Sequence, residues 1–171
     1  MSSTKPAETE YAPYFHTYIG KVPQNNLIEA LNDSHQKLLA FLRGLPKEKH
    51  NYSYAEGKWS ITELVGHLID CERVFAYRAL TFARNDKALL PGFDEDAYAV
   101  ESNAGKRSME SLLEEYLCLR KCNILFFESL TDEMLMRKGT ANGKEITVRA
   151  IGFIISGHEL HHMEVIKERY L

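Results

Sequence analysis

Four long stretches of the chain place apolar residues at every third or fourth position, which is the repeat of an α-helix with one buried face. They cover about residues 24–45, 60–85, 108–129 and 147–171. Ser60, with Glu63 three positions later, forms a capping-box signature, and Thr147 is placed to cap the last helix. No stretch alternates strongly enough between apolar and polar residues to predict a sheet. The pattern predicts an all-α protein built as a four-helix bundle.

The chain divides into a polar N-terminal segment and a single helical domain. Residues 1–23 carry three prolines and predict an extended arm that wraps the outside of the bundle. Residues 24–171 are long enough to bury one substantial core. Residues 86–107 form an unusually long connection between the second and third helices, and long ordered connections are often functional. Residues 131–146 predict a short helical turn, followed by a tight turn at an Asn-Gly pair.

Charge and composition argue against several classes of partner. The 21 Lys and Arg residues are scattered among 24 Asp and Glu, for a formal net charge of -3, so no phosphate-binding footprint is predicted and we expect no nucleic-acid partner. The first 18 residues contain one lysine and no apolar run, so we expect no secretory signal. No stretch approaches the roughly 20 apolar residues of a membrane span. Three cysteines are an odd number and favour reduced thiols, which predicts a cytoplasmic protein.

Three histidines fall on the apolar faces of the predicted helices. His67 lies on the second helix, and His158 and His162 lie four positions apart on the fourth. Four residues turn an α-helix by about 1.1 turns, so the last two imidazoles project roughly 40° apart and can hold one cation. A third imidazole from another helix would complete the site. Buried imidazoles that nothing satisfies are costly, so the pattern favours a divalent metal such as zinc, nickel, iron or manganese. The alternative is that each histidine is a satisfied core residue.

Other nearby residues are weaker candidates for the site. His35 occupies a core position on the first helix and is a possible further ligand. His161 projects about 100° from His162 and is expected in an outer or surface position. Cys71 follows His67 by four positions, and we interpret it as a core thiol, because free cysteines behave as small hydrophobic residues. The same interpretation applies to Cys118 and Cys122.

Several short motifs make the chain similar to a known family. The runs Gly66-His67-Leu68 and Gly157-His158-Glu159-Leu160-His161-His162, with Lys58-Trp59-Ser60-Ile61, the segment 90–98 and Arg120, resemble the DinB-like family of small metal-binding bundles. The likeness runs from about residue 24 to residue 171. It implies that His67, His158 and His162 are the three metal ligands. It also implies a relation to bacillithiol S-transferases, to a mycothiol-dependent maleylpyruvate isomerase and, through the family name, to stress response or detoxification.

Asp70 and Arg120 are the predicted catalytic residues, each with a structural alternative. Asp70 follows His67 by three positions and could orient an imidazole or act as a base, or else pair with Arg73 or Arg78. Arg120 could hold an anionic group of a substrate, or form a salt bridge to a buried carboxylate.

Glu159 points about 100° away from the ligand face and is expected in solvent. Trp59 and Tyr98 are expected at the mouth of the pocket. Apolar faces left uncovered on the long helices would allow a homodimer.

A site of three neutral histidines leaves coordination positions open, as catalytic metal sites do. A metal held in this way can lower the pKa of a bound water or thiol. The sequence therefore predicts a metal-dependent thiol S-transferase or hydrolase that acts on small electrophilic molecules, with a low-molecular-weight thiol as the cosubstrate of a transferase. The alternative is a non-enzymatic metal-binding bundle with a structural or assembly role.

Overall fold

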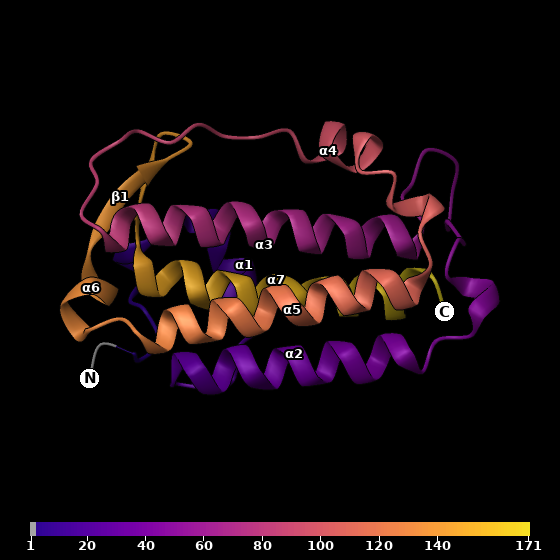
Figure 1. Ribbon diagram of the computed structural model, residues 1–171, viewed down its shortest axis with the longest axis horizontal. Coiled ribbons are helices and arrows are strands. Elements are labelled where there is room, and N and C mark those ends of the chain that lie inside the picture. The colour runs from indigo at the N-terminus through magenta and orange to yellow at the C-terminus, as the bar shows by residue number, and fades with distance from the viewer. Residues whose placement is uncertain (1–2) are drawn as a thin grey trace.

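The computed structural model describes residues 3–171 and confirms the predicted four-helix bundle (Figure 1). The four long helices are α2 (Leu27–Arg43), α3 (Ile61–Ala83), α5 (Met109–Glu128) and α7 (Val148–Arg169). Ser60 accepts a hydrogen bond from the Glu63 amide while the Glu63 carboxylate accepts one from the Ser60 amide, so the predicted capping box forms at α3. Thr147 caps α7 by accepting from the Ala150 amide, also as predicted.

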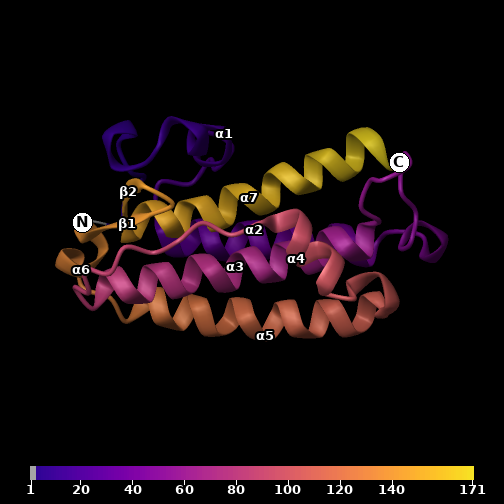
Figure 2. The same cartoon turned by 90° about the horizontal axis from the view of Figure 1, so that it is seen from above.

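The helices are arranged so that α3 and α7 lie side by side. Helix α7 packs against α2 and α3, and α5 packs against the same two helices, which places α5 diagonally opposite α7 (Figures 1 and 2). Helices α2 and α7 run in the same direction, because Leu27 and Gly152, near their first residues, are in contact. Helix α3 runs the opposite way, since Phe82 near its end meets Gly139 just before α7.

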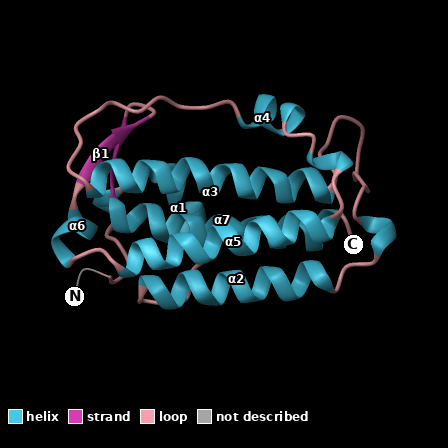
Figure 3. Ribbon diagram, viewed as in Figure 1, coloured by secondary structure: helices cyan, strands magenta, loops and turns pink. Residues whose placement is uncertain are grey.

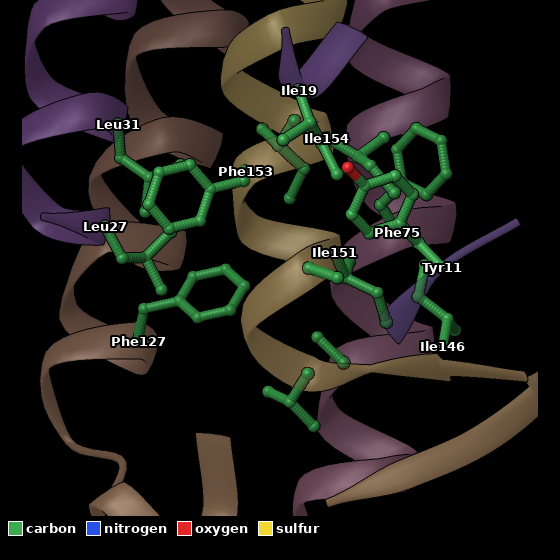
Figure 4. Packing of buried hydrophobic residues seen from close by; sticks show 14 of the residues in the cluster. Tyr11, Ile19, Leu27, Leu31, Phe75, Phe127, Ile146, Ile151, Phe153 and Ile154 are labelled. Carbon is green, nitrogen blue, oxygen red and sulfur yellow. The ribbon is translucent and has the colours of Figure 1, made fainter. Parts of the chain in front are cut away.

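Helix α7 is buried on more than one side, and this organises the core. Figure 4 shows Phe153 of α7 pointing toward Leu31 of α2 and Phe127 of α5. Ile154 points the other way, toward Ile19 of the N-terminal arm. Full burial of a large apolar side chain of this kind contributes roughly 1.5–3 kcal/mol relative to exposure. The two sides of α7 therefore join the bundle and the arm in one core.

The N-terminal arm is folded into short helical turns. These are η1 (Glu8–Glu10), η2 (Pro13–Phe15) and α1 (His16–Ile19). The expectation of an extended arm over residues 1–23 is wrong for this stretch, because a proline at the first position of a turn favours helical backbone. Tyr11, Tyr18 and Ile19 are buried in the same core as α7, whereas Tyr14 is 67% exposed, so only part of the arm's aromatic cluster packs on the bundle. Residues 1–2 lie outside the described residues.

Short elements occupy the connections between the long helices. They are η3 (Lys47–Lys49), α4 (Glu95–Glu101), η4 (Ala104–Lys106) and α6 (Asp132–Met136). Helix α4 lies in the long connection between α3 and α5, which runs back along the length of α3 in Figure 1. Asp94 caps α4 by accepting a hydrogen bond from the Ala97 amide. The connection is thereby ordered, and it ends up beside the face of α3 that carries His67.

A short β-hairpin precedes α7, which corrects the prediction that the chain forms no sheet (Figure 3). Its antiparallel strands are β1 (Lys138–Ala141) and β2 (Lys144–Thr147). Asn142 and Gly143 connect them with φ of 50° and 70°, the left-handed conformation that a two-residue hairpin turn requires. The strands are too short and too polar to give a clear alternation. The Asn-Gly pair was the informative signal, because that dipeptide is typical of hairpins.

Two further surface features follow from the fold. Cys118 and Cys122 are exposed on α5, so their expected packing role is wrong: both project from the side of α5 that faces away from α2 and α3. Within residues 3–171, no helix combines the length and the apolar character that a membrane span requires.

Candidate metal centre

The fold brings together the three histidines on α3 and α7. Nε2 of His158 lies 3.2 Å from Nε2 of His67 and 3.0 Å from Nε2 of His162. His67 and His158 are 7% and 6% exposed, and His162 is half-buried. Two helices that run in opposite directions thus bring the Nε2 atom of His158 within 3.2 Å of a ring nitrogen on each of the other two histidines.

Aromatic rings enclose the cluster and fix the orientation of its imidazoles. The Trp59 ring lies 4.7 Å from the His67 ring, centroid to centroid. The Tyr18 and Phe75 rings meet the His158 ring edge-on, at 5.2 Å and 6.2 Å. Helix α7 comes this close to the arm because residue 157 is glycine: a Cβ there would lie 2.1 Å from the Tyr18 carbonyl oxygen.

Hydrogen bonding does not account for the convergence at His158. A ring nitrogen has one in-plane position, which carries either a proton or a lone pair, so Nε2 of His158 cannot bond well to both neighbours. Two nitrogens bound to one metal ion at about 2.0–2.1 Å, with an angle between about 90° and 110°, lie roughly 2.9–3.4 Å apart. The separations of His158 from His67 and from His162 both fall within that range. The arrangement matches what a shared cation needs.

The electrostatic setting keeps the three imidazoles neutral. Burial lowers the pKa of His67 to about 4. Burial, and then the neighbouring His67 and His161, lower the pKa of His162 to about 3. The pKa of His158 is lowered as well, by burial and then by His162 and His67. Neutral imidazole is the form that binds metals, so the cluster carries its ligands ready for a cation at neutral pH.

Cys71 is the other potential ligand beside the cluster. One donor atom each from Cys71, His67 and His158 lie within 4.8 Å of one another. However, the Cys71 sulfur is 3.6 Å from both ring nitrogens of His67, which places it beside the ring rather than along either lone pair. Burial, and then the charge of Glu95, raise the pKa of the Cys71 thiol to about 12. The group of three mutually close donors thus contains two of the histidines and Cys71, and the protonated thiol is its least suited ligand.

His35 lies away from the cluster, in the interior of the bundle. Its ring is 5.0 Å from the Tyr116 ring, and burial, and then the charge of Arg120, lower its pKa to about 4. Its Nδ1 atom is buried and has no hydrogen-bond partner among residues 3–171. His35 does not line the cavity at the histidine cluster, and so is not placed as a further ligand.

A cavity of about 480 Å³ opens onto the cluster, within the usual size range for small-molecule sites. Its walls come from the arm, α3, the connection before α4, the β-hairpin and α7. Apolar and aromatic groups predominate, including Phe15, Phe75, Phe93 and Ile151. The charged side chains on its wall are Arg78, Glu95, Lys144 and Glu145. The cavity therefore suits a small, partly apolar molecule with a polar group.

The predicted pocket-mouth residues are placed differently. Trp59 lines the cavity, whereas Tyr98 does not. Tyr98 is 48% exposed and packs on Phe93, which is on the wall, with ring centroids 5.2 Å apart. His161 also lines the cavity, with its ring 5.4 Å from the Tyr18 ring, so it borders the site without joining the three converging nitrogens.

Asp70 is half-buried on α3 and does not line the cavity. Its carboxylate lies 3.6 Å from the guanidinium of Arg73, which also pairs with Glu115 of α5 at 2.5 Å. Burial raises the pKa of Asp70, although the charge of Arg73 opposes this effect. The structure thus brings Asp70 into a surface ion-pair group and not to the histidines.

Arg120 is fully buried in the centre of the bundle and holds two carboxylates. Its Nε and Nη2 donate to the two oxygens of Glu72 at 2.8 Å and 2.9 Å, and its Nη1 donates to Glu159 at 2.9 Å. Two more residues of α5 donate to these carboxylates: Tyr116 donates to Glu159, and Asn123 donates to Glu72 at 2.9 Å. Arg120 does not line the cavity, so its surroundings match the salt-bridge alternative.

The expectation that Glu159 is solvated is wrong. Glu159 is 2% exposed, and it accepts hydrogen bonds from Arg120, Tyr116 and Ser34. It lies off the ligand face, as its position in the sequence indicates. The side of α7 that carries Glu159 is also buried, because α7 contacts α2 as well as α3.

None of the four charged residues on the cavity wall was predicted from the sequence as part of the site, and two of them show why. Arg78 is 8% exposed on α3, and the signal that could have identified it was a charged residue on an otherwise apolar helix face. Glu95 comes from the long connection, where no periodicity indicates its direction. Only the folded arrangement places it at the cavity.

Comparisons with known proteins place this fold and site in a family. Two curated relatives, from Oceanobacillus iheyensis and Geobacillus thermodenitrificans, are each 26% identical and carry provisional names as metal-dependent hydrolases. The first match covers 87% of this chain and 91% of the relative, and the second covers 79% and 77%.

Among solved structures, YfiT from Bacillus subtilis is described as a probable metal-dependent hydrolase with an unusual four-helix bundle topology. It has a TM-score of 0.73 at 19% identity, covers 98% of this chain and is itself covered over 94% of its length, which supports the same fold. The sequence model of the DinB superfamily matches residues 30–166. Because that match spans most of the chain, the protein belongs to the DinB superfamily.

Proposed function

We propose that His67, His158 and His162 hold one divalent metal ion, and that the protein is a metal-dependent enzyme acting on a small electrophilic molecule. The observation that carries the proposal is the position of the His158 Nε2 atom, 3.0 Å from that of His162 and 3.2 Å from that of His67, with all three rings on the wall of one cavity. Three protein ligands leave positions free for substrate, which is the pattern of catalytic sites.

The donor set fits a borderline cation such as zinc, nickel, iron or manganese. All three groups are neutral imidazoles, and the site is enclosed by aromatic rings. Nδ1 of His162 is buried and has no hydrogen-bond partner within residues 3–171. That ring therefore depends on Nε2 for its polar interaction, and a cation at the cluster would supply it.

A divalent ion held there would act as a Lewis acid that polarises the electrophile and favours the ionised form of a nucleophile. The protein's own contribution is to orient the reactants and to exclude water with the aromatic walls. Glu95 is the candidate to accept a proton, because it is a carboxylate on the wall of the same cavity as the histidines. Its charge is among the causes, after burial, that raise the pKa values of Tyr18 and Cys71, which both contact ligand histidines.

Two nucleophiles suit this site, and each leads to a different reaction class. The names of the relatives favour water and hydrolysis, whereas the family resemblance in the sequence favours a low-molecular-weight thiol and S-transfer to an electrophile in detoxification or stress response. We propose a small-molecule electrophile as substrate, with either nucleophile, and no nucleic-acid or membrane partner. A cytoplasmic location and a homodimer stay predictions.

Metal analysis of matched variants tests the proposal. Purified protein is chelated, reloaded with zinc, nickel, iron(II) or manganese, and its bound metal is measured by mass spectrometry. We expect about one ion per chain in the wild type and in His35→Ala, a buried histidine outside the cluster, and little in His158→Ala. Ester hydrolysis and thiol conjugation are then measured over a panel of electrophiles. Equal metal content in the two variants, or equal rates with and without metal, would contradict the proposal.

A non-enzymatic metal site is the second candidate, because Cys71 lies close enough to close the coordination sphere. In that case Cys71→Ala would lower the metal affinity as much as His158→Ala does, and chelation would lower the melting temperature without any turnover to lose. The proposed enzyme requires that Cys71→Ala retain most of its metal.

A further inference from the structure

Arg78, a cation on the cavity wall, has no counter-charge beside it in the part of the chain that the structure describes. Arg78 is 8% exposed, and its Nη2 donates to the backbone carbonyl of Pro91 at 2.8 Å. Within residues 3–171, no Asp or Glu carboxylate lies within 4.0 Å of its guanidinium. Burying an unpaired charge is costly, and such groups are normally paired with an anion. The other deeply buried arginine, Arg120, shows this pattern by holding two carboxylates.

The surroundings of Arg78 hold its guanidinium in place while leaving donors free. Its Cζ lies 6.0 Å from the centre of the Phe75 ring and 5.8 Å from that of the Phe93 ring. The bond to Pro91 uses one of the five N–H donors of the side chain. The remaining donors form a fork of the kind that binds a carboxylate through two parallel hydrogen bonds.

Phe75 connects this cation to the histidine cluster. The same ring that packs beside Arg78 lies 6.2 Å from the His158 ring, and all three side chains line the cavity. A molecule that spans from the guanidinium to the histidines must therefore pass along an apolar wall. This path selects for a molecule with an anionic end, an apolar middle and a reactive end.

We propose that Arg78 is the anion-binding group of the cavity and that the natural ligand is a small amphipathic carboxylate, bound with its carboxylate on Arg78 and its reactive group at the histidines. A carboxylate fits better than a more highly charged anion, because Glu95 and Glu145 share the wall and oppose multiple negative charge. The inference rests on the proposed function only in taking this cavity as the substrate site.

A matched pair of probes separates charge recognition from apolar binding. Binding of 4-phenylbutyrate and of its neutral amide is measured by calorimetry with full-length protein, first after chelation and then after zinc loading. In the chelated protein we expect the carboxylate to bind at least tenfold more tightly than the amide. That preference should disappear in Arg78→Met while the affinity for the amide changes less than twofold. Lys144→Met, which removes the exposed cation of the same wall, should keep the preference for the carboxylate.

The design keeps a fold defect distinct from a lost binding group. Arg78→Lys retains the charge without the fork, and it should bind the carboxylate roughly threefold more tightly than the amide. Its melting temperature shows whether loss of the hydrogen bond to Pro91 destabilises the fold. Equal binding of the two probes by the wild type would overturn the inference, as would a preference that survives in Arg78→Met or disappears in Lys144→Met. Metal content, measured separately, reports on the histidine site, so failure of one proposal leaves the other standing.

Discussion

Replacing Arg120 by methionine tests the most deeply buried polar group of the bundle. The substitution removes the donors to Glu72 and Glu159 and also the 3.0 Å hydrogen bond to the Leu31 carbonyl oxygen. Methionine has a similar length and fills most of the space, so the cavity left behind is small. What remains is a pair of carboxylates, 3% and 2% exposed, that face each other without a cation.

The size of the effect follows from the uncompensated charge. Removing one partner of a buried ion pair typically costs about 3–5 kcal/mol, because the other charge stays out of water. For a chain of this size that loss corresponds to a decrease in melting temperature of roughly 6–20 °C. Neutralising the carboxylates as well, in Arg120→Met with Glu72→Gln and Glu159→Gln, removes the stranded charges, so we expect the triple variant to be more stable than the single one by at least about 1 kcal/mol.

Urea unfolding followed by circular dichroism provides the measurement, and Arg120→Lys is the control that keeps the charge without the paired hydrogen bonds. We expect the order of stability to be wild type, then Arg120→Lys, then Arg120→Met. A change in the free energy of unfolding below about 1 kcal/mol for Arg120→Met would refute the reasoning. A stable variant that retains metal and loses turnover would instead support the catalytic role predicted from the sequence.

Three other perturbations give expected results of different kinds. Gly157→Ala should lower stability by about 1–3 kcal/mol in thermal unfolding despite the higher helix propensity of alanine, since the new Cβ would lie 2.1 Å from the Tyr18 carbonyl oxygen; unchanged stability would contradict the close contact. Burial alone would raise the pKa of Glu10, but hydrogen bonds from Arg149 and other groups outweigh burial and lower the pKa. The ionised Glu10 therefore stabilises the fold above about pH 4.5, and this stabilisation is lost as the pH falls through the pKa of the folded state. Glu10→Gln should therefore flatten the decrease in stability between about pH 5 and pH 3, and an unaltered pH profile would exclude the linkage. Chelation should lower the melting temperature of the zinc-loaded wild type, because a ligand that binds only the folded state stabilises it; His158→Ala should show no such shift.

The sequence was sufficient to predict the elements whose signals are local. Apolar periodicity identified the four long helices, and the caps at Ser60 and Thr147 located the starts of two of them. The same periodicity placed His67 and His158 on buried faces, and in the structure both are buried with their Nε2 atoms 3.2 Å apart. The hairpin was missed, because four-residue strands carry too little periodicity to register against the neighbouring helices.

Residues whose surroundings depend on a second partner helix could not be placed from the sequence. Glu159 projects about 100° from the ligand face, which in a helix with one buried side would mean solvent. Helix α7 has neighbours on two sides, so the same direction ends at Arg120. Asp70 shows the converse: it is near His67 in sequence, but its carboxylate lies beside Arg73, which is the structural alternative that the sequence left open.

The buried network and the histidine cluster are connected through consecutive residues of α7. His158 faces the cavity while Glu159 is held by Arg120, so the rotation of the helix that satisfies one carboxylate also aims one imidazole. Because neighbouring residues are fixed about 100° apart, any rotation of α7 that breaks the Glu159 contact turns His158 away from His67 by the same angle. A residue that never touches the cavity can therefore decide whether three nitrogens converge. On this argument Arg120→Met weakens metal binding as well as folding, and the triple variant, which relieves the stranded charge without restoring the hydrogen bonds, should regain stability more fully than metal affinity.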